Sequence, residues 1–390
     1  MLWWAHLLGF NPWNMFRHDS SAPNSGAVVL PRGAHWKSAR QVRKNMAKPR
    51  RASTKKASDP MTFMNLTAGK WVSQAIAVAA ELGIADVLKD GSRTAADIAR
   101  TANASEDGVY RLLRALGSVG LFAETGNRRF RLTPLGKLLR TDSTQALGGY
   151  GRFVGHESTW RPWGELRHSV RTGEPAFDHV FDMPIFEYFA KMSESAAVFD
   201  AAMTSISTLE AKAVVAAYDF SGIGTLVDVA GGHGLMVATV LKANRRMRGV
   251  LFDLPHVTAG ATALLQSGGV ADRCQVVSGD FFESVPVGGD AYLMKHIIHD
   301  WDDERATQIL RNCHRAMRAR GKVLIVDAVI PPGNSAHFGK LLDLEMLVLT
   351  PRGRERTQAE FRELLRRSGF RLRRVVATET HLSVVEGVRA

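Results

Sequence analysis

The stretch LVDVAGGHG at residues 226–234 runs from apolar residues through an aspartate into three glycines within four positions. The residues that follow, LMVATVLKANR at 235–245, have the spacing of a helix. A strand that passes through glycines into a helix leaves main-chain N–H groups bare, so that a ligand can approach them. The stretch therefore predicts the first strand, turn and helix of an α/β sheet. The turn would hold a pyrophosphate, a nucleoside or no ligand.

Strand-like and helical runs alternate along the rest of the C-terminal half. The strand-like runs are RGVLFDLP (248–255), CQVVSGDFF (274–282), DAYLMK (290–295) and GKVLIVDAVI (321–330), and the helical runs are VTAGATALLQSGG (257–269) and ERATQILRNCHRAMR (304–318). This alternation is typical of right-handed crossovers and a parallel, doubly wound, Rossmann-like sheet. Thr357 and Glu360 form a capping box before the helix 358–369. Two late strand-like runs, 371–379 and 382–388, predict a closing β-hairpin.

The residues before position 150 have a different pattern. We expect a continuous helix over 71–88, a short helix from Thr94, a helix capped by Ser105, and strands at 121–125 and 129–133 around a turn at Gly126-Asn127. Helices followed by a hairpin indicate a winged-helix-like module. Its presumed recognition helix carries only Arg111 and Arg114, which favours packing or dimerisation over DNA reading.

These patterns divide the chain into four parts. Residues 1–60 form a basic, disordered tail, 61–150 the winged-helix-like module, 151–220 a helical connector that contributes to a substrate pocket, and 221–390 the α/β domain. The division agrees with a length of 390 residues, which exceeds one typical domain core.

The net charge of +13 is located mainly in the tail, which contains eleven Lys and Arg but only two Asp. The remaining chain is only mildly basic, so we expect no nucleic-acid partner. The apolar start of the tail is broken by Asn and Pro, and it is too short for a membrane span. A transit peptide and a true start at Met61 are the alternatives to a disordered tail. The only cysteines, Cys274 and Cys313, exclude a disulfide scaffold and fit a reducing, cytoplasmic compartment.

The residues at successive strand ends distinguish between ligands. The first end has Gly231, Gly232 and Gly234, and the second has Asp253, whose distance from the glycines suits a ribose. The third end is Gly279-Asp280-Phe281, where the carboxylate would meet an adenine amino group and the ring would stack on the base. A dinucleotide turn needs a further glycine where this chain has Val237. These positions favour S-adenosyl-L-methionine (SAM) over NAD. The alternative is a tight turn with two surface acids.

The stretch LMKHIIHDWDDERA at 293–306 follows the fourth strand. His296 and His299 have the spacing of a metal pair, but no third ligand is spaced nearby, so we expect no metal. His299 at a strand end is a candidate general base. A phenol-like hydroxyl with a pKa of about 10 is a poor nucleophile, whereas an imidazole with a pKa of about 6.5 can take its proton.

Six ordered motifs carry a family resemblance: LVDVAGGHG, FDLPHV, GDFF, MKHIIHDWDDE, GKVLIVDAVIP and RGRERTQAEF. The chain, over about residues 65 to 388, resembles the plant-type small-molecule O-methyltransferases, which include caffeate and acetylserotonin enzymes and bacterial polyketide-tailoring enzymes. The resemblance implies a SAM-dependent homodimer that methylates a hydroxyl of a small acceptor without a metal, with the winged-helix-like module as dimerisation domain.

The resemblance also implies roles for individual residues. His299 would be the base, and Asp327 and Glu355 would flank and orient it. Lys295 would touch the polar end of the cofactor. Plausible pocket walls are Phe199, Met203 and Met346. The chain departs from the family pattern at two positions: Ala230 replaces a glycine, and Asp327 replaces a glutamate.

Three alternatives remain open at this point. A C- or N-methyltransferase would use the same cofactor half. A non-catalytic SAM-binding regulator would use the winged helix on DNA. A magnesium-dependent catechol-type enzyme would need a metal, and the His-centred site and the N-terminal module disfavour it.

Overall fold

The computed structural model describes residues 59–143 and 145–390, so the predictions for the tail lie outside the described residues. The chain splits into two compact units, residues 1–70 and 71–390. The described part of the first unit is mainly α2 (Pro60–Thr67), whose N-cap Asp59 accepts a hydrogen bond from the Met61 N–H. None of the described helices is long and apolar enough to cross a membrane.

The N-terminal module contains four helices and a small sheet. Its elements are α3 (Gly69–Glu81), α4 (Ile84–Val87), β1 (Arg93–Thr94), α5 (Ala95–Thr101), α6 (Glu106–Ser118), β2 (Phe122–Glu124) and β3 (Arg129–Leu132). The predicted caps at Thr94 and Ser105 and the hairpin of β2 and β3 are confirmed. The prediction of one helix over 71–88 is wrong, because Gly83 has a φ of 61° and ends the first helix there.

A helical segment follows, which begins before the predicted connector of 151–220. It consists of η3 (Gly136–Leu139), α7 (Gly148–Gly155), α8 (Glu157–Gly164), α9 (Leu166–Thr172), α10 (Ala176–Phe181), α11 (Ile185–Lys191) and α12 (Ser193–Ala217). Its aromatic residues form a separate core around Phe153, Phe177 and Phe189. Val348 and Leu349 of the later helix α17 (Gly339–Leu349) belong to this core. The connector is thus packed against a segment that follows the last parallel strand.

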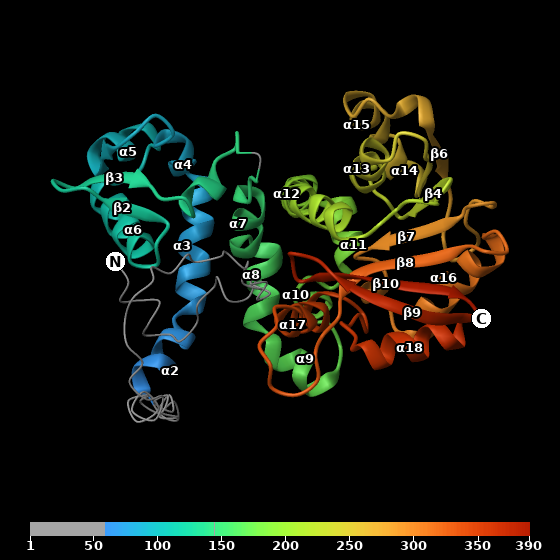
Figure 1. Cartoon of the computed structure of the whole chain (residues 1–390). Helices are drawn as coiled ribbons and strands as arrows, with labels where there is room; N and C mark the ends of the chain where they lie inside the picture. The colour runs from blue at the N-terminus through green and yellow to red at the C-terminus, as the bar shows by residue number, and fades with distance from the viewer. Residues whose placement is uncertain (1–58, 144) are drawn as a thin grey trace, which may run out of the picture. The chain divides into compact units, whose positions relative to one another are not determined.

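The C-terminal half forms one mixed sheet of seven strands (Figure 1). The strands are β4 (Thr225–Val229), β5 (Arg248–Asp253), β6 (Cys274–Ser278), β7 (Ala291–Lys295), β8 (Lys322–Ala328), β9 (Phe370–Ala377) and β10 (Leu382–Arg389), in the order β6-β5-β4-β7-β8-β10-β9. The first five strands along this chain are parallel, and β10 is antiparallel to both β8 and β9. The predicted doubly wound sheet and closing hairpin are confirmed.

Helices cover both faces of this sheet, because alternate strand residues point to opposite sides. Leu226 packs in a core with residues of α12, α13 (Leu235–Ala243) and α15 (Ala261–Ser267). Its neighbour Val227 packs in a second core with α16 (Asp303–Ala316) and α18 (Gln358–Arg367). The Thr357–Glu360 capping box is present at the start of α18. The predicted helix over 257–269 is wrong, since the chain forms α14 (Pro255–Thr258) and then α15.

Candidate active site

The glycine-rich turn at the carboxyl end of β4 is shaped by its lack of side chains. A Cβ on Gly231 would lie 2.6 Å from Leu251 Cδ1 and 2.7 Å from the Asp228 carboxylate, so no larger residue fits there. Gly232 and Gly234 have φ of 60° and 86°, which glycine adopts at little cost. Ala230 has a φ of 55°, an unfavourable value for a residue with a Cβ. The turn thus lacks side chains as predicted, but its N–H groups are not free: those of Gly231, Gly232 and Gly234 donate to the Phe252 carbonyl, the Asp253 carboxylate and the Gly231 carbonyl.

Asp253 ends β5 directly beside this turn. Its Oδ2 accepts a hydrogen bond from the Gly232 N–H at 2.8 Å, and its Oδ1 accepts one from the Leu254 N–H at 2.7 Å. The carboxylate therefore holds the glycine turn in place, a role beyond the ribose contact predicted for it. Sequence reasoning did not anticipate this first role, because it depends on how β4 and β5 are aligned.

A second carboxylate, which the sequence analysis missed, connects the strand before the turn with the helix after it. Asp228 on β4 is buried, and its Oδ2 accepts a hydrogen bond from the Val237 N–H in the first turn of α13 at 3.0 Å. Burial raises the pKa of Asp228 to about 7. The aspartate in LVDVAGGHG was visible, but its place within a strand gave no sign that it bonds the next helix.

The end of β6 supplies the third predicted segment. The Gly279 N–H donates to the Asp253 carbonyl at 3.0 Å, so the two strand ends adjoin. Asp280 Oδ1 accepts a hydrogen bond from the Phe282 N–H at 2.7 Å. The ring of Phe281 meets that of Phe282 edge to face, with centroids 4.8 Å apart. A bare turn, a carboxylate and an aromatic ring thus lie at three adjacent strand ends, an arrangement that fits a nucleoside.

His299 lies in a short 3₁₀ turn, η5 (Ile298–Asp300), and only 6% of its surface is exposed. Its Nδ1 donates a hydrogen bond to Oε1 of the buried Glu355 at 2.7 Å, which leaves Nε2 as the atom for a reacting proton. Burial alone would lower the pKa of His299, but the carboxyl groups of Asp300, Glu355 and Asp327 raise it to about 10. Nε2 lies 3.5 Å from Oδ1 of Asp300.

Asp327, the second predicted partner of His299, makes a different contact. It is the second-last residue of β8 and is fully buried, and its Oδ1 accepts a hydrogen bond from the His296 N–H at 3.0 Å. Its Oδ2 has no hydrogen-bond partner among the residues that the structure describes. Burial raises the pKa of Asp327 to about 6, although His299 nearby lowers it. Of the two acids expected to orient His299, only Glu355 bonds it, because Asp327 bonds the main-chain N–H of His296 instead.

Lys295 is part of an ionic cluster that was not predicted. Its Nζ donates to Oε2 of Glu210 at 3.1 Å and to the Ser207 hydroxyl at 3.0 Å, both on α12. His296 Nε2 bonds the other oxygen of Glu210 at 2.9 Å. Burial would raise the pKa of Glu210, but His296 and Lys295 hold it well below its usual range. Burial also lowers the pKa of His296 to about 4, so its imidazole is neutral at neutral pH.

The cluster changes one premise of the sequence analysis. The fold brings Glu210, His296 and His381 together, and also His296, His299 and Asp327, with possible ligand atoms within 4.8 Å of one another in each group. The expectation that no third ligand lies nearby is therefore wrong, because those ligands come from distant segments. Glu210 already bonds His296 Nε2, and Glu355 bonds His299 Nδ1.

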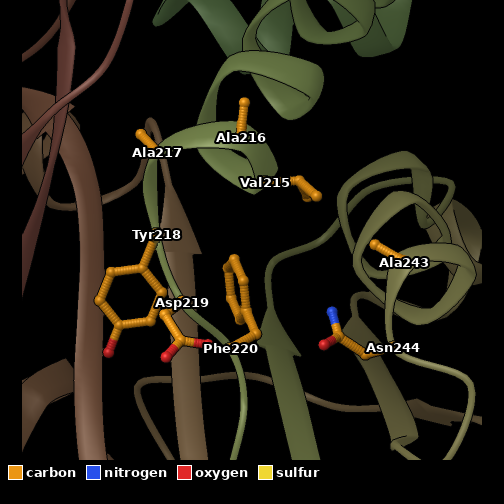
Figure 2. A pocket seen from close by; sticks show the side chains of 8 residues that line it. All are labelled: Val215, Ala216, Ala217, Tyr218, Asp219, Phe220, Ala243 and Asn244. Carbon is orange, nitrogen blue, oxygen red and sulfur yellow. The ribbon is translucent and has the colours of Figure 1, made fainter.

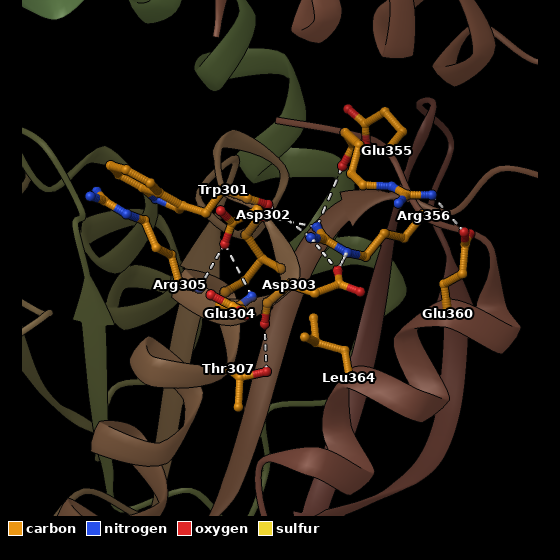
Figure 3. Close-up of polar contacts among 12 residues, drawn as sticks. Trp301, Asp302, Asp303, Glu304, Arg305, Thr307, Glu355, Arg356, Glu360 and Leu364 are labelled. Atoms are coloured by element: carbon orange, nitrogen blue, oxygen red, sulfur yellow. Dashed lines mark hydrogen bonds and ion pairs between the residues drawn. The ribbon is translucent and has the colours of Figure 1, made fainter. Parts of the chain in front are cut away.

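The segment after α17 fixes the position of the His299 turn (Figure 3). Arg356 is 1% exposed and bonds Asp303, the first residue of α16, through Nε at 3.0 Å and Nη2 at 2.8 Å. The same guanidinium donates to the carbonyls of Ile298 and Trp301 at 2.9 and 2.8 Å. Neighbouring Asp302 caps α16 by accepting from two main-chain N–H groups. The acids after His299 thus have separate structural roles.

The predicted pocket walls come from two parts of the chain. Phe199 and Met203 on α12 pack at the edge of the aromatic core, and Met346 is buried on α17. Asp343 of α17 accepts a hydrogen bond from the Glu355 N–H at 2.8 Å, so this helix is tied to the acid that bonds His299. A separate cavity of about 380 Å³ lies between the C-terminal ends of α12 and α13, before β4 begins (Figure 2). It contains none of the predicted site residues.

Comparison with known proteins identifies the family. Residues 163–371 match the model of the O-methyltransferase domain, and residues 64–142 match that of the O-methyltransferase dimerisation domain. The chain belongs to the O-methyltransferase family. The phenazine O-methyltransferase PhzM of Lysobacter antibioticus is 43% identical to this O-methyltransferase over 83% of the chain and 94% of PhzM. The family resemblance and fold class inferred from the sequence are confirmed.

Solved structures extend this comparison. The S-adenosylhomocysteine-bound form of CalO1, a methyltransferase of calicheamicin biosynthesis, is 35% identical, with a TM-score of 0.78 over 86% of this chain and all of that chain. NcsB1 from neocarzinostatin biosynthesis, in complex with SAM and 2-hydroxy-5-methyl naphthoic acid, is 34% identical, with a TM-score of 0.68 over 82% of this chain and 96% of that chain. One relative at 36% identity over 75% of this chain and 84% of its own, from Streptomyces davaonensis, is an N,N-dimethyltransferase of 8-amino-8-demethylriboflavin.

Proposed function

We propose that this O-methyltransferase transfers a methyl group from SAM to a hydroxyl of a small aromatic secondary metabolite, with His299 as general base and without a metal. The observation that carries the proposal is the buried His299–Glu355 pair, with a 2.7 Å hydrogen bond, on the same edge of the sheet as the bare glycine turn. When bound, SAM supplies a methyl group on a positively charged sulfur.

The cofactor would be held by the three adjacent strand ends. Gly231, Gly232 and Gly234 would leave room for it, and Asp253 would accept hydrogen bonds from its ribose. Asp280 and Phe281, after Gly279, would receive the adenine. The Lys295 ammonium has three donors and uses two on Ser207 and Glu210, so one is left for a carboxylate.

The charge of His299 is decisive for its role as a base. With three acids around it, the imidazole keeps a proton at neutral pH in the protein alone. A positive charge placed beside His299 would lower its pKa and release that proton to solvent. Nε2 would then accept the proton of the acceptor hydroxyl, and Glu355 would stabilise the imidazolium that forms.

Oxygen is the acceptor that most needs this base, because a phenol-like hydroxyl is protonated at neutral pH. An aromatic amine has a free lone pair and would depend less on His299. The N-methylating relative supports nitrogen as the second candidate acceptor.

Assembly and location follow from other features. The dimerisation-domain match supports a homodimer, and so do the exposed apolar side chains of Phe63, Leu66 and Trp71, which a second copy would cover. The mildly basic body supports a protein without a nucleic-acid partner. Cys274 and Cys313 are buried and unpaired, which supports the cytoplasm as the compartment.

Two measurements test the proposal. Calorimetric titration with S-adenosylhomocysteine should show micromolar binding that Asp253→Ala abolishes and that Asp272→Ala, an exposed acid on η4 (Ala271–Arg273), leaves unchanged. Methyl transfer to phenolic compounds should survive a chelator and fall about 100-fold or more in His299→Gln. Absence of binding by folded protein would refute the cofactor site, and near-normal turnover of His299→Gln would refute the base.

A further inference from the structure

Glu345 is a carboxyl group that the proposed reaction does not use. It lies on α17 next to the buried Met346 and two residues after Asp343, which bonds the Glu355 N–H. The helix that carries Glu345 is therefore fixed to the acid that bonds His299. The side chain of Glu345 is partly buried, and burial raises its pKa to about 7.

The partners of Glu345 are unusual for a buried acid. Its Oε2 accepts a hydrogen bond from the indole N–H of Trp163, which is a neutral donor. Among the residues that the structure describes, no basic side chain pairs with it, and Oε1 makes no hydrogen bond. A carboxylate removed from water without a cation is costly, so a fold does not keep one for stability alone. An acid with a strongly shifted pKa and only a neutral partner is a candidate ligand-binding residue.

A tyrosine lies in the same aromatic surroundings as Glu345. Tyr150 on α7 packs against the aromatic core that also contacts Trp163, the residue that bonds Glu345. Burial raises the pKa of Tyr150 to about 12, and Glu345 and Glu210 contribute to the rise. Glu210 bonds His296, whose ring centroid lies 4.9 Å from that of His299. The Tyr150 hydroxyl makes no hydrogen bond to any described residue.

The surroundings of these groups are apolar. Tyr150, Trp163, Phe199 and Met203 all pack at the edge of the aromatic core that includes the end of α17. Two polar groups in an aromatic-lined pocket can fix the orientation of a flat ligand. A carboxylate only accepts hydrogen bonds, so its partner must donate one.

We propose that Glu345 and Tyr150 bind a hydrogen-bond donor of the acceptor, which is then an aromatic compound with an amino group or a second hydroxyl away from the hydroxyl that is methylated. This assignment rests on the proposed function, since it assumes that the pocket beside His299 receives the acceptor. Glu345 thereby becomes a specificity-determining residue. Without the donor, Oε1 of Glu345 has no hydrogen-bond partner among the described residues.

Matched pairs of probes test this inference. The protein loaded with S-adenosylhomocysteine would be titrated by calorimetry with 2,7-dihydroxynaphthalene and 2-naphthol, and with 3-amino-4-hydroxybenzoate and 4-hydroxybenzoate, so that each pair differs by one donor. We expect wild type to prefer the donor-bearing member of at least one pair by about tenfold, and Glu345→Gln to reduce that preference to about twofold or less. Glu187→Gln, an exposed acid paired with Lys191, is the matched control and should change nothing.

Stability gives a second readout that needs no acceptor. Because Glu345 is a partly buried acid without a basic partner among the described residues, Glu345→Gln should raise the thermal unfolding midpoint at pH 8. Equal affinities within both probe pairs in wild type, an equal loss for both members in Glu345→Gln, or a lower unfolding midpoint of this variant would overturn the inference. Methyl transfer to 2-naphthol by wild type reports on the proposed function separately, because that probe lacks the second donor.

Discussion

Arg356 holds the main chain on both sides of His299. Its guanidinium donates to the carbonyls of Ile298 and Trp301, while the His299 carbonyl itself accepts from the Arg354 N–H at 2.7 Å. The adjacent Glu355 bonds the imidazole. One short segment thus fixes both the backbone and the ring of the proposed base, which is the rigid support that proton transfer requires.

Replacing Arg356 by lysine should therefore impair both folding and turnover. Lysine keeps the charge but cannot reach Asp303 and two carbonyls at once, since it lacks the planar fork. We expect the unfolding free energy to fall by about 2 kcal/mol or more and kcat to fall about tenfold with little change in KM for SAM. Denaturant unfolding and steady-state kinetics measure these effects. Arg354→Lys, at an exposed pair with Glu360, is the control and should cost under about 1 kcal/mol. Equal effects of the two substitutions would contradict the role given to Arg356.

Glu355→Gln should separate the two acids near His299. The substitution removes the negative charge at Nδ1, so the imidazolium formed during the reaction loses its stabilisation. We expect kcat to fall about 100-fold and the apparent pKa of the pH–rate profile to move down. Asp327→Asn should cost much less, because Asp327 bonds the His296 N–H rather than the imidazole. If Asp327→Asn proved the more damaging change, the assignment of Glu355 as the orienting acid would fail.

The pKa of His299 also predicts a pH dependence of stability. Its folded value, about 10, exceeds the unfolded value of about 6.5. The stabilisation is therefore fully present below about pH 6.5 and is lost as the pH rises through about 10. Between pH 7 and 9.5, the unfolding free energy of wild type should decrease relative to His299→Gln by up to about 1.4 kcal/mol per pH unit. If the unfolding free energies of the two proteins changed equally with pH across this range, His299 would not bind the proton in the folded state.

Ala230→Gly should stabilise the protein. The φ of 55° at Ala230 costs a residue with a Cβ about 1–2 kcal/mol. Glycine avoids this steric cost, although fixing its more flexible backbone cancels part of the gain. We expect a gain of about 1 kcal/mol in unfolding free energy and no loss of affinity for S-adenosylhomocysteine. Asn127→Gly, at φ 48° in the turn between β2 and β3, is the comparison, and its gain should be smaller because asparagine tolerates this region. A destabilised Ala230→Gly variant would show that the alanine methyl makes contacts that outweigh the strain.

Local patterns predicted the fold well. The succession of strands and helices could be inferred because buried runs, caps and turn residues each specify local structure independently of distant contacts, as at Thr357 and in the hairpin around Gly126-Asn127. The two errors, at Gly83 and within 257–269, are both places where a glycine interrupts an otherwise helical pattern. Periodicity does not reveal whether such a glycine adopts a left-handed or a helical conformation.

The candidate site was predicted less completely. His299 and Asp253 were predicted because they stand in motifs at strand ends, and Glu355 because its motif RGRERTQAEF carries the family resemblance. Glu210 and Glu345 were missed because neither stands in a recognisable motif. Their partners lie far away in the sequence: His296 is 86 positions from Glu210, and Trp163 is 182 positions from Glu345. Only the folded chain brings these residues together.

The place of β10 in the sheet affects how the protein is made. This strand, Leu382–Arg389, lies between β8 and β9, although it follows both in the sequence. During synthesis, β8 has one side unpaired until these last residues have emerged and inserted. Asp327 lies on β8 and bonds the His296 N–H in the segment that leads to His299, so the candidate site cannot reach its final form earlier. A nascent or truncated chain would instead offer the edge of β8 to other chains, which makes late translation the step most exposed to aggregation.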